Sequence, residues 1–177
     1  MITTRLLRIR AELGDSDAQF RLGYRLAFNR KLKSRNMGEA MNWWGLASKQ
    51  GHTRATFYLA TCYERGLGCE IDVSKAIKLY RKAASVGHEV AQYNLGISYR
   101  DGNGVRRNSK LAKEWLQKSA LNGYAAAQND LGVLYFEGKG VRRDTARARF
   151  WYAKSAEQGY PMGQRNLNRL RVSKSKE

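Results

Sequence analysis

The side chains that could do catalytic or metal chemistry in this chain are two histidines and two cysteines. His52 and His88 lie 36 residues apart, and Tyr124 and Tyr160 stand at the corresponding positions further along. No cysteine, aspartate or glutamate recurs with these histidines at the spacing of zinc ligands or of a nucleophile and its base. Because tyrosine replaces histidine at this position, we interpret both histidines as packing residues. The sequence predicts no catalytic residue, no metal site and no cofactor, and an enzyme is the least favoured hypothesis.

Cys62 and Cys69 are the two cysteines of the chain. Cys62 falls on an apolar helical stripe, and Cys69 stands where Val105 and Val141 occur later in the sequence. We predict two reduced, structural thiols, with a disulfide or a redox role as the alternative. Reduced thiols favour a reducing compartment. No segment resembles a membrane span or a signal peptide, so we expect a cytoplasmic protein unless an export signal preceded Met1.

Pairs of glycines separated by one residue are a third feature that could do chemistry, because glycine-rich loops bind phosphates. These pairs are Gly66 and Gly68, Gly102 and Gly104, and Gly138 and Gly140. The nucleotide-binding fingerprint also requires a preceding strand and a third glycine, and both are missing here. We therefore interpret the pairs as turns, in which glycine adopts conformations that other residues resist.

The turns belong to a repeat. The pattern Ala-x-x-x-Leu-small occurs at Ala18, Ala55, Ala91 and Ala127, with spacings of 37, 36 and 36 residues. Ala91, Leu95 and Tyr99 form one apolar helical stripe, and the adjacent Gly96 allows another helix to approach. The glycine turn ends this first helix. Each repeat is therefore predicted to open with one amphipathic helix.

A second helix is predicted after each turn. It begins at a capping residue, carries a bulky pair such as Trp43-Trp44 or Trp151-Tyr152, and ends at a glycine. The capping residues are Asn36, Asp72, Asn108 and Asp144, and the final glycines are Gly51, Gly87, Gly123 and Gly159. Each repeat is thus expected to be a helical hairpin.

The combination Ala-x-x-x-Leu-Gly-x-x-Tyr, Gly-x-Gly-Val-x-x-Asp/Asn, then alanine and a bulky pair resembles the Sel-one-like repeat (SLR), a relative of the tetratricopeptide repeat. Repeat one departs from this pattern, since Leu26 replaces the tyrosine and residues 29–33 replace the glycine turn. The resemblance implies an all-α fold, an α/α superhelical solenoid of about four stacked hairpins with half-repeat caps. We predict a single repeat domain, 1–177, made of a capping helix at 1–17, repeats at 18–54, 55–90, 91–126 and 127–162, and a capping helix and tail at 163–177.

The resemblance implies an adaptor, a scaffold or an immunity-like partner that binds another protein. By analogy with tetratricopeptide solenoids, the first helices line a concave groove. The groove residues that this implies are Phe20, Tyr24, Phe28, Phe57, Thr61, Tyr93, Ile97, Arg100, Asn129, Val133, Phe136, Arg165 and Arg169. The alternative is that the aromatic members only pack between hairpins.

Charge indicates what kind of partner to expect. The net charge is +18, with nine basic and three acidic residues in 1–37 and five basic and one acidic in 160–177. Such a chain favours an acidic protein or peptide. The alternative is nucleic acid or an anionic surface, bound through the basic ends and a loop ridge. The predicted ridge consists of Arg30, Lys31, Lys33, Arg35, Arg106, Arg107, Arg142 and Arg143.

Overall fold

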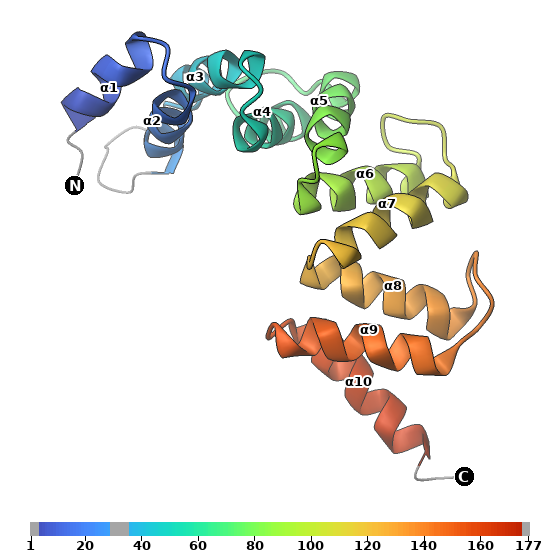
Figure 1. Ribbon diagram of the computed structural model, residues 1–177. Helices are drawn as coiled ribbons and strands as arrows, with labels where there is room; N and C mark the ends of the chain where they lie inside the picture. Colours follow the sequence, from blue (N-terminus) through green and yellow to red (C-terminus); the bar gives the residue numbers. More distant parts are fainter. Residues whose placement is uncertain (1–3, 29–35, 175–177) are drawn as a thin grey trace. The chain divides into compact units, whose positions relative to one another are not determined.

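The structure is a computed structural model that describes residues 4–28 and 36–174, with side chains up to residue 170. These residues form ten α-helices and no β-strand (Figure 1), which confirms the predicted all-α class. In chain order the helices are α1 (Thr4–Glu12), α2 (Ser16–Phe28), α3 (Met37–Lys49), α4 (Thr53–Arg65), α5 (Val73–Ser85), α6 (Glu89–Asp101), α7 (Ser109–Leu121), α8 (Ala125–Glu137), α9 (Thr145–Glu157) and α10 (Pro161–Lys174).

Successive pairs of helices form the four predicted hairpins: α2–α3, α4–α5, α6–α7 and α8–α9, with α1 and α10 as half-units. The chain separates into two compact units, Met1–His88 and Glu89–Glu177, here called unit 1 and unit 2. Within each unit every helix packs against the next one along the chain, and α10 also contacts α8. The single domain and its repeat boundaries stay a prediction. No described helix has the length and apolar character needed to cross a membrane.

The second helix of each hairpin begins at the capping residue that the sequence predicts. Side-chain oxygens of the four caps accept hydrogen bonds from backbone N–H groups three residues on, at distances of 2.8–3.0 Å. The caps are Asn36, Asp72, Asn108 and Asp144. These bonds satisfy backbone donors that the helix itself leaves without a partner. A local rule of capping therefore fixes where each second helix starts.

The core of each hairpin holds one bulky residue of the second helix. These residues are Trp44, Tyr80, Leu116 and Tyr152, and none is more than 3% exposed. In three hairpins the first helix presents a glycine at the contact: Gly23, Gly96 and Gly132. A Cβ atom on these glycines would lie 2.6 Å from Nε1 of Trp44, 2.9 Å from Cγ of Leu116 and 2.7 Å from Cδ1 of Tyr152. Only glycine therefore permits the observed helix separation.

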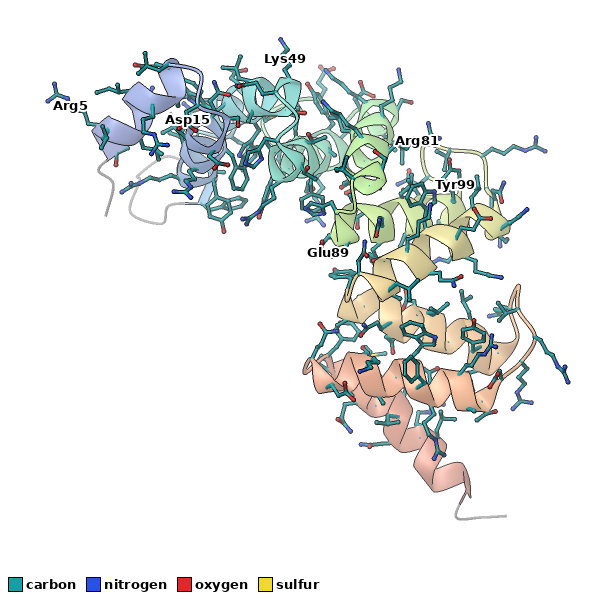
Figure 2. All side chains as sticks on the ribbon, viewed as in Figure 1. Arg5, Asp15, Lys49, Arg81, Glu89 and Tyr99 are labelled. Atoms are coloured by element: carbon teal, nitrogen blue, oxygen red, sulfur yellow. The ribbon has the colours of Figure 1, made fainter. Side chains whose placement is uncertain are left out.

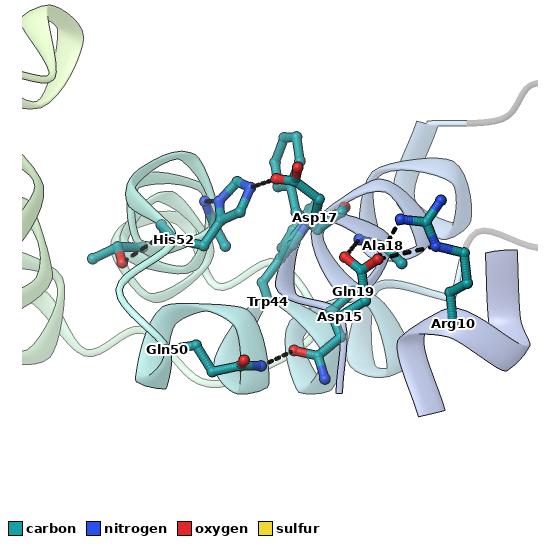
Figure 3. Close-up of polar contacts among 11 residues, drawn as sticks. Arg10, Asp15, Asp17, Ala18, Gln19, Trp44, Gln50 and His52 are labelled. Atoms are coloured by element: carbon teal, nitrogen blue, oxygen red, sulfur yellow. Dashed lines mark hydrogen bonds and ion pairs between the residues drawn. The ribbon is translucent and has the colours of Figure 1, made fainter. Parts of the chain in front are cut away.

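Amide side chains join one hairpin to the next. Gln19 donates to the carbonyl oxygen of Ala11 at 3.0 Å and accepts from Gln50 at 2.8 Å, as Figure 3 shows in part. In unit 2, Gln128 repeats both bonds, donating to a carbonyl of α7 at 3.1 Å and accepting from Gln158 at 2.8 Å. These glutamines are 4–5% exposed, and the bonds offset the loss of water around their amide groups.

Both cysteines are free thiols in this structure, and both pack within unit 1. Cys62 is 2% exposed, and Cys69 is half-buried with its Sγ 3.6 Å from the Cys62 carbonyl oxygen. Burial raises the pKa of the Cys62 thiol to about 12, and it also raises the pKa of Cys69. The thiolate form, which is the reactive one, is therefore suppressed at both positions.

We predict opposite effects of adding one methyl group at two helical glycines of unit 1. Gly23→Ala should destabilise the protein by about 1–3 kcal/mol, because the methyl group displaces the Trp44 indole from its hydrogen bond to the Phe20 carbonyl oxygen, at 3.2 Å. Gly45→Ala should stabilise it by about 0.5–1 kcal/mol, since nothing lies within 4 Å of a Cβ there. Urea unfolding followed by circular dichroism measures both changes. Equal effects would contradict the close-contact explanation.

A second prediction concerns the thiols. In a Cys69→Ala variant, Cys62 should react with a thiol reagent at mildly alkaline pH about a thousandfold more slowly in the folded than in the urea-unfolded protein. The reason is that a raised pKa lowers the thiolate fraction, and the rate should climb as the pH approaches the raised pKa. Absorbance of the released chromophore follows the reaction. Similar rates in both states would show that Cys62 is accessible and ionisable in the fold.

Candidate functional site

The two histidines pack against phenylalanine rings, as the sequence predicts. The ring of His52 stacks on Phe20 with centroids 4.6 Å apart, and His88 stacks on Phe57 at the same distance. His52 also caps α4, because its Nδ1 accepts an N–H of the first turn at 3.1 Å, and its Nε2 lies 3.1 Å from Asp17 (Figure 3). No group of three metal-binding side chains forms among the described residues.

An aromatic patch lies on the first helices of unit 1. It consists of Tyr24 and Phe28 on α2 and Tyr58 on α4, with ring centroids 4.8–5.9 Å apart. Tyr24 and Phe28 are 43% and 45% exposed, so both of these predicted groove residues are accessible to a partner. Tyr58 is half-buried, and burial raises the pKa of its hydroxyl. Three rings that hold each other in place can contact a partner without losing much conformational freedom.

Phe20 was predicted to line the groove, but it is only 7% exposed. His52 stacks on its ring, the Arg54 guanidinium lies 5.0 Å above it, and Tyr24 and Tyr58 flank it. Phe20 therefore belongs to the core of unit 1 and not to a partner surface.

Phe57 and Thr61, also predicted for the groove, make contacts within unit 1. Phe57 is half-buried between His88 and Tyr80. The Thr61 hydroxyl donates to the Phe57 carbonyl oxygen at 3.1 Å and lies 3.3 Å from the Tyr80 hydroxyl, which donates to Glu64 at 2.9 Å. These groups hold the second hairpin together, as the packing alternative proposes.

In unit 2 the predicted residues Tyr93, Arg100 and Asn129 surround one carboxylate, that of Asp130. Tyr93 donates to Asp130 at 3.2 Å, Asn129 donates at 3.1 Å, and Arg100 lies 3.8 Å away. Burial raises the pKa of Asp130, while the bonds from Asn129 and Tyr93 and the charge of Arg100 act in the opposite direction. Burial, followed by the nearby Asp130 charge, also raises the pKa of Tyr93. The carboxylate is held by side chains of the fold itself.

Asn129 itself is 5% exposed and does not belong to an accessible groove. Its side chain accepts a hydrogen bond from Asn166 of α10 at 2.8 Å, in addition to the bond that it donates to Asp130. A buried amide needs these partners, so it cannot also serve an external ligand. Ile97 is half-buried, whereas Arg100 and Arg165 are exposed.

Three other predicted residues meet in one cavity between α8, α9 and α10. This helix cavity has a volume of about 370 Å³, and Val133, Phe136 and Arg169 line it. Its remaining walls are Glu137, Tyr152, Asn166 and Leu170. Glu137 is paired with Lys139 at 2.7 Å, and Arg169 is exposed. Burial raises the pKa of Tyr152 to about 12, so its hydroxyl is uncharged at neutral pH. The cavity combines apolar walls with the exposed guanidinium of Arg169.

The basic loop residues are partly described. Arg106, Arg107, Arg142 and Arg143 are exposed, whereas Arg30, Lys31, Lys33 and Arg35 lie outside the described residues. Basic side chains also project from the helices elsewhere, for example at Arg5 and Lys49 (Figure 2). Arg142 and Arg143 line one cavity together, and Arg107 lines a different one. The loops therefore present separate basic sites in unit 2.

Sequence reasoning missed several residues of these surfaces. Tyr58, at the centre of the aromatic patch, lies on the same helix as the predicted Phe57 and Thr61 but is not among the predicted groove residues. Tyr152 comes from a second helix, whereas the groove was predicted on first helices and the capping helix, and Leu170 is the neighbour of the predicted Arg169 on the capping helix. The recurring bulky pair of the second helix was the available signal for Tyr152.

Comparison with known proteins identifies the repeat. The family model described as Sel1 repeat matches residues 16–52, 53–88, 90–124 and 125–160. A stretch of 77 residues is 32% identical in sequence to part of DAP3-binding cell death enhancer 1 of Rattus norvegicus. This stretch makes up 44% of this chain and 14% of that protein. The chain therefore spans only a small part of this relative.

Two solved structures are similar over most of the chain. The first is c5321, a protective antigen present in uropathogenic Escherichia coli strains and displaying an SLR fold, with a TM-score of 0.84 and 39% identity over 90% of this chain and 34% of that chain. The second is a Sel1 repeat protein from Oxalobacter formigenes, with a TM-score of 0.78 and 33% identity over 88% of this chain and 63% of that chain. These similarities confirm the predicted helical repeat solenoid.

Proposed function

Because the chain belongs to the Sel1 repeat family, whose members are generally protein–protein interaction modules, we propose that it is a non-enzymatic module that binds an acidic segment of a partner protein. The segment inserts one large apolar side chain into the helix cavity and places a carboxylate against Arg169. Free, packed thiols support a reducing compartment, which we take to be the cytoplasm.

The helix cavity is the observation on which this proposal rests. Its volume of about 370 Å³ is in the range of small binding pockets, and Val133, Phe136 and Leu170 give it apolar walls. Phe136 is 39% exposed, so it can bury further surface when a partner side chain enters. Apolar side chains that fill such pockets contribute most of the affinity in many protein interfaces.

The charge around the cavity supports an acidic partner. Arg165 and Arg169 lie one helical turn apart on α10, both exposed, and the chain carries a net charge of +18. Glu137, the carboxylate of the cavity, is already paired with Lys139. Arginine forms two parallel hydrogen bonds with a carboxylate, which gives orientation as well as attraction. The long-range field also accelerates encounter with an acidic protein.

Peptides selected from a random display library against the immobilised full chain test this proposal. We expect selected peptides to share a large apolar residue beside aspartate or glutamate. Phe136→Ala should lower the affinity of such a peptide about tenfold or more, because aromatic side chains at the centre of an interface are frequent hot spots. Fluorescence anisotropy measures the affinity, and circular dichroism verifies that the variant is folded.

Phe150→Ala provides the matched control. Phe150 is a 53% exposed phenylalanine on α9 that does not line the helix cavity, so its removal should leave the affinity unchanged. Arg169→Gln should weaken binding of the acidic peptide but not of the same peptide with asparagine in place of aspartate. Equal losses in Phe136→Ala and Phe150→Ala, or selected peptides without acidic residues, would refute the proposal.

A further inference from the structure

A second cavity of unit 2 lies at the turn of the fourth hairpin, and basic side chains dominate its walls. This loop cavity has a volume of about 560 Å³. The lining residues are Lys113 of α7, Tyr135 of α8, Val141, Arg142, Arg143 and Asp144 of the turn, and Arg147 of α9. The residues come from three helices and one turn, so they meet only in the folded hairpin.

The charges of the loop cavity are not balanced. Asp144, its single carboxylate, caps α9 through the Arg147 N–H at 2.9 Å and lies 3.3 Å from Nε of the same arginine. The ion pairs in the described part of unit 2 include no carboxylate partner for Lys113, Arg142 or Arg143. Four cations and one carboxylate therefore line one concave surface, and an anion from outside would be attracted to the excess positive charge.

Aromatic contacts help to orient the arginines. The Arg147 guanidinium lies 5.5 Å above the Tyr135 ring and 3.5 Å from its hydroxyl, and the Arg143 guanidinium lies 5.8 Å from the Phe136 ring. Such contacts restrict long side chains before a ligand arrives and so reduce the entropy lost on binding. The Tyr135 hydroxyl adds a polar group that can donate to an anion.

We propose that the loop cavity binds a phosphate group, which Lys113, Arg142 and Arg143 hold at the turn between α8 and α9. A phosphate monoester carries about 1.5 to 2 negative charges at neutral pH and offers acceptor oxygens in several directions. A single carboxylate carries one charge and would leave more of the cationic excess uncompensated. Arginine matches phosphate through parallel hydrogen bonds, and lysine adds a point charge.

The preceding hairpin supplies a natural comparison. Its turn carries Arg106 and Arg107 at the positions of Arg142 and Arg143, but Leu111 stands where the fourth hairpin has Arg147. Both turns expose two arginines. Arg142 and Arg143 line the loop cavity together, whereas Arg107 lines a different cavity, with Lys113 and an Arg100 that is paired with Asp101. The two arginine pairs have the same charge and different surroundings, which makes them a matched test.

Isothermal titration calorimetry of the full chain with inorganic pyrophosphate, at constant ionic strength, tests the proposal. We expect saturable binding to one site. The double variant Arg142→Gln, Arg143→Gln should lose about tenfold or more in affinity, because charge-assisted hydrogen bonds are lost. The double variant Arg106→Gln, Arg107→Gln should stay within about twofold, since neither residue lines the loop cavity and the distant charges are screened by salt. No saturation, or equal losses in the two variants, would overturn the proposal.

Competition experiments identify the source of the phosphate group. Pyrophosphate that displaces a 5′-phosphorylated oligonucleotide points to a nucleic-acid end, and pyrophosphate that displaces the protein from phosphatidic acid vesicles points to a lipid headgroup. Binding of pyrophosphate alone points to a free phosphate compound, and each of these results supports the cavity. An unphosphorylated oligonucleotide that binds as tightly as the phosphorylated one would instead show an extended polyanion site and refute the proposed phosphate site.

Arg169→Gln should leave pyrophosphate binding unchanged, so this test is independent of the peptide proposal.

Discussion

The close contact between a bulky side chain of the second helix and a small residue of the first sets the geometry of the hairpins. Gly132 and Tyr152 show why, since a Cβ on the glycine would overlap the tyrosine ring. The contact uses one face of each helix and fixes the distance between them. The remaining faces are then left for neighbouring hairpins and for partners. Tyr152 illustrates both roles, because it fills the hairpin core and also lines the helix cavity. The residues that build the fold and those that offer a surface are therefore neighbours on the same helices.

Contacts between hairpins are also local and repeated. Gln19 of α2 is hydrogen-bonded to α1 and to the residue that ends α3. Gln128 stands at the equivalent position of α8 in unit 2 and is hydrogen-bonded to α7 and to the residue that ends α9. Such an arrangement makes stability a sum of similar nearest-neighbour terms, which is typical of repeat proteins. Surface residues can then differ from repeat to repeat while the framework stays the same. The aromatic patch of unit 1 and the basic loop cavity of unit 2 are two such differences on one framework.

Much of this fold is predictable from sequence, because caps and turns follow local chemistry. Asn108 and Asp144 mark helix starts through bonds that span only three residues. The surface is harder to predict, because exposure depends on side chains distant in the sequence. Phe20 is covered by His52, and Asn129 is bonded to Asn166 of the capping helix. Neither residue is accessible to a partner, although its position in the repeat predicts that it lines the groove. The loop cavity needs Lys113 and Arg147, which no turn motif connects. The division after His88 falls at a boundary between two matched repeats, but the repeat pattern does not distinguish this boundary from the others.

The contact between Arg143 and the Phe136 ring has a thermodynamic consequence. Arg143 lines the loop cavity and Phe136 lines the helix cavity, and the guanidinium lies 5.8 Å from the ring. An anion that draws Arg143 away from the ring removes a favourable contact from the wall of the other cavity. Conversely, a partner side chain that enters the helix cavity and immobilises Phe136 changes how freely Arg143 can move. Binding free energies at two linked sites must change by equal amounts in both directions. The two ligands proposed for unit 2 would therefore be coupled through a single pair of side chains.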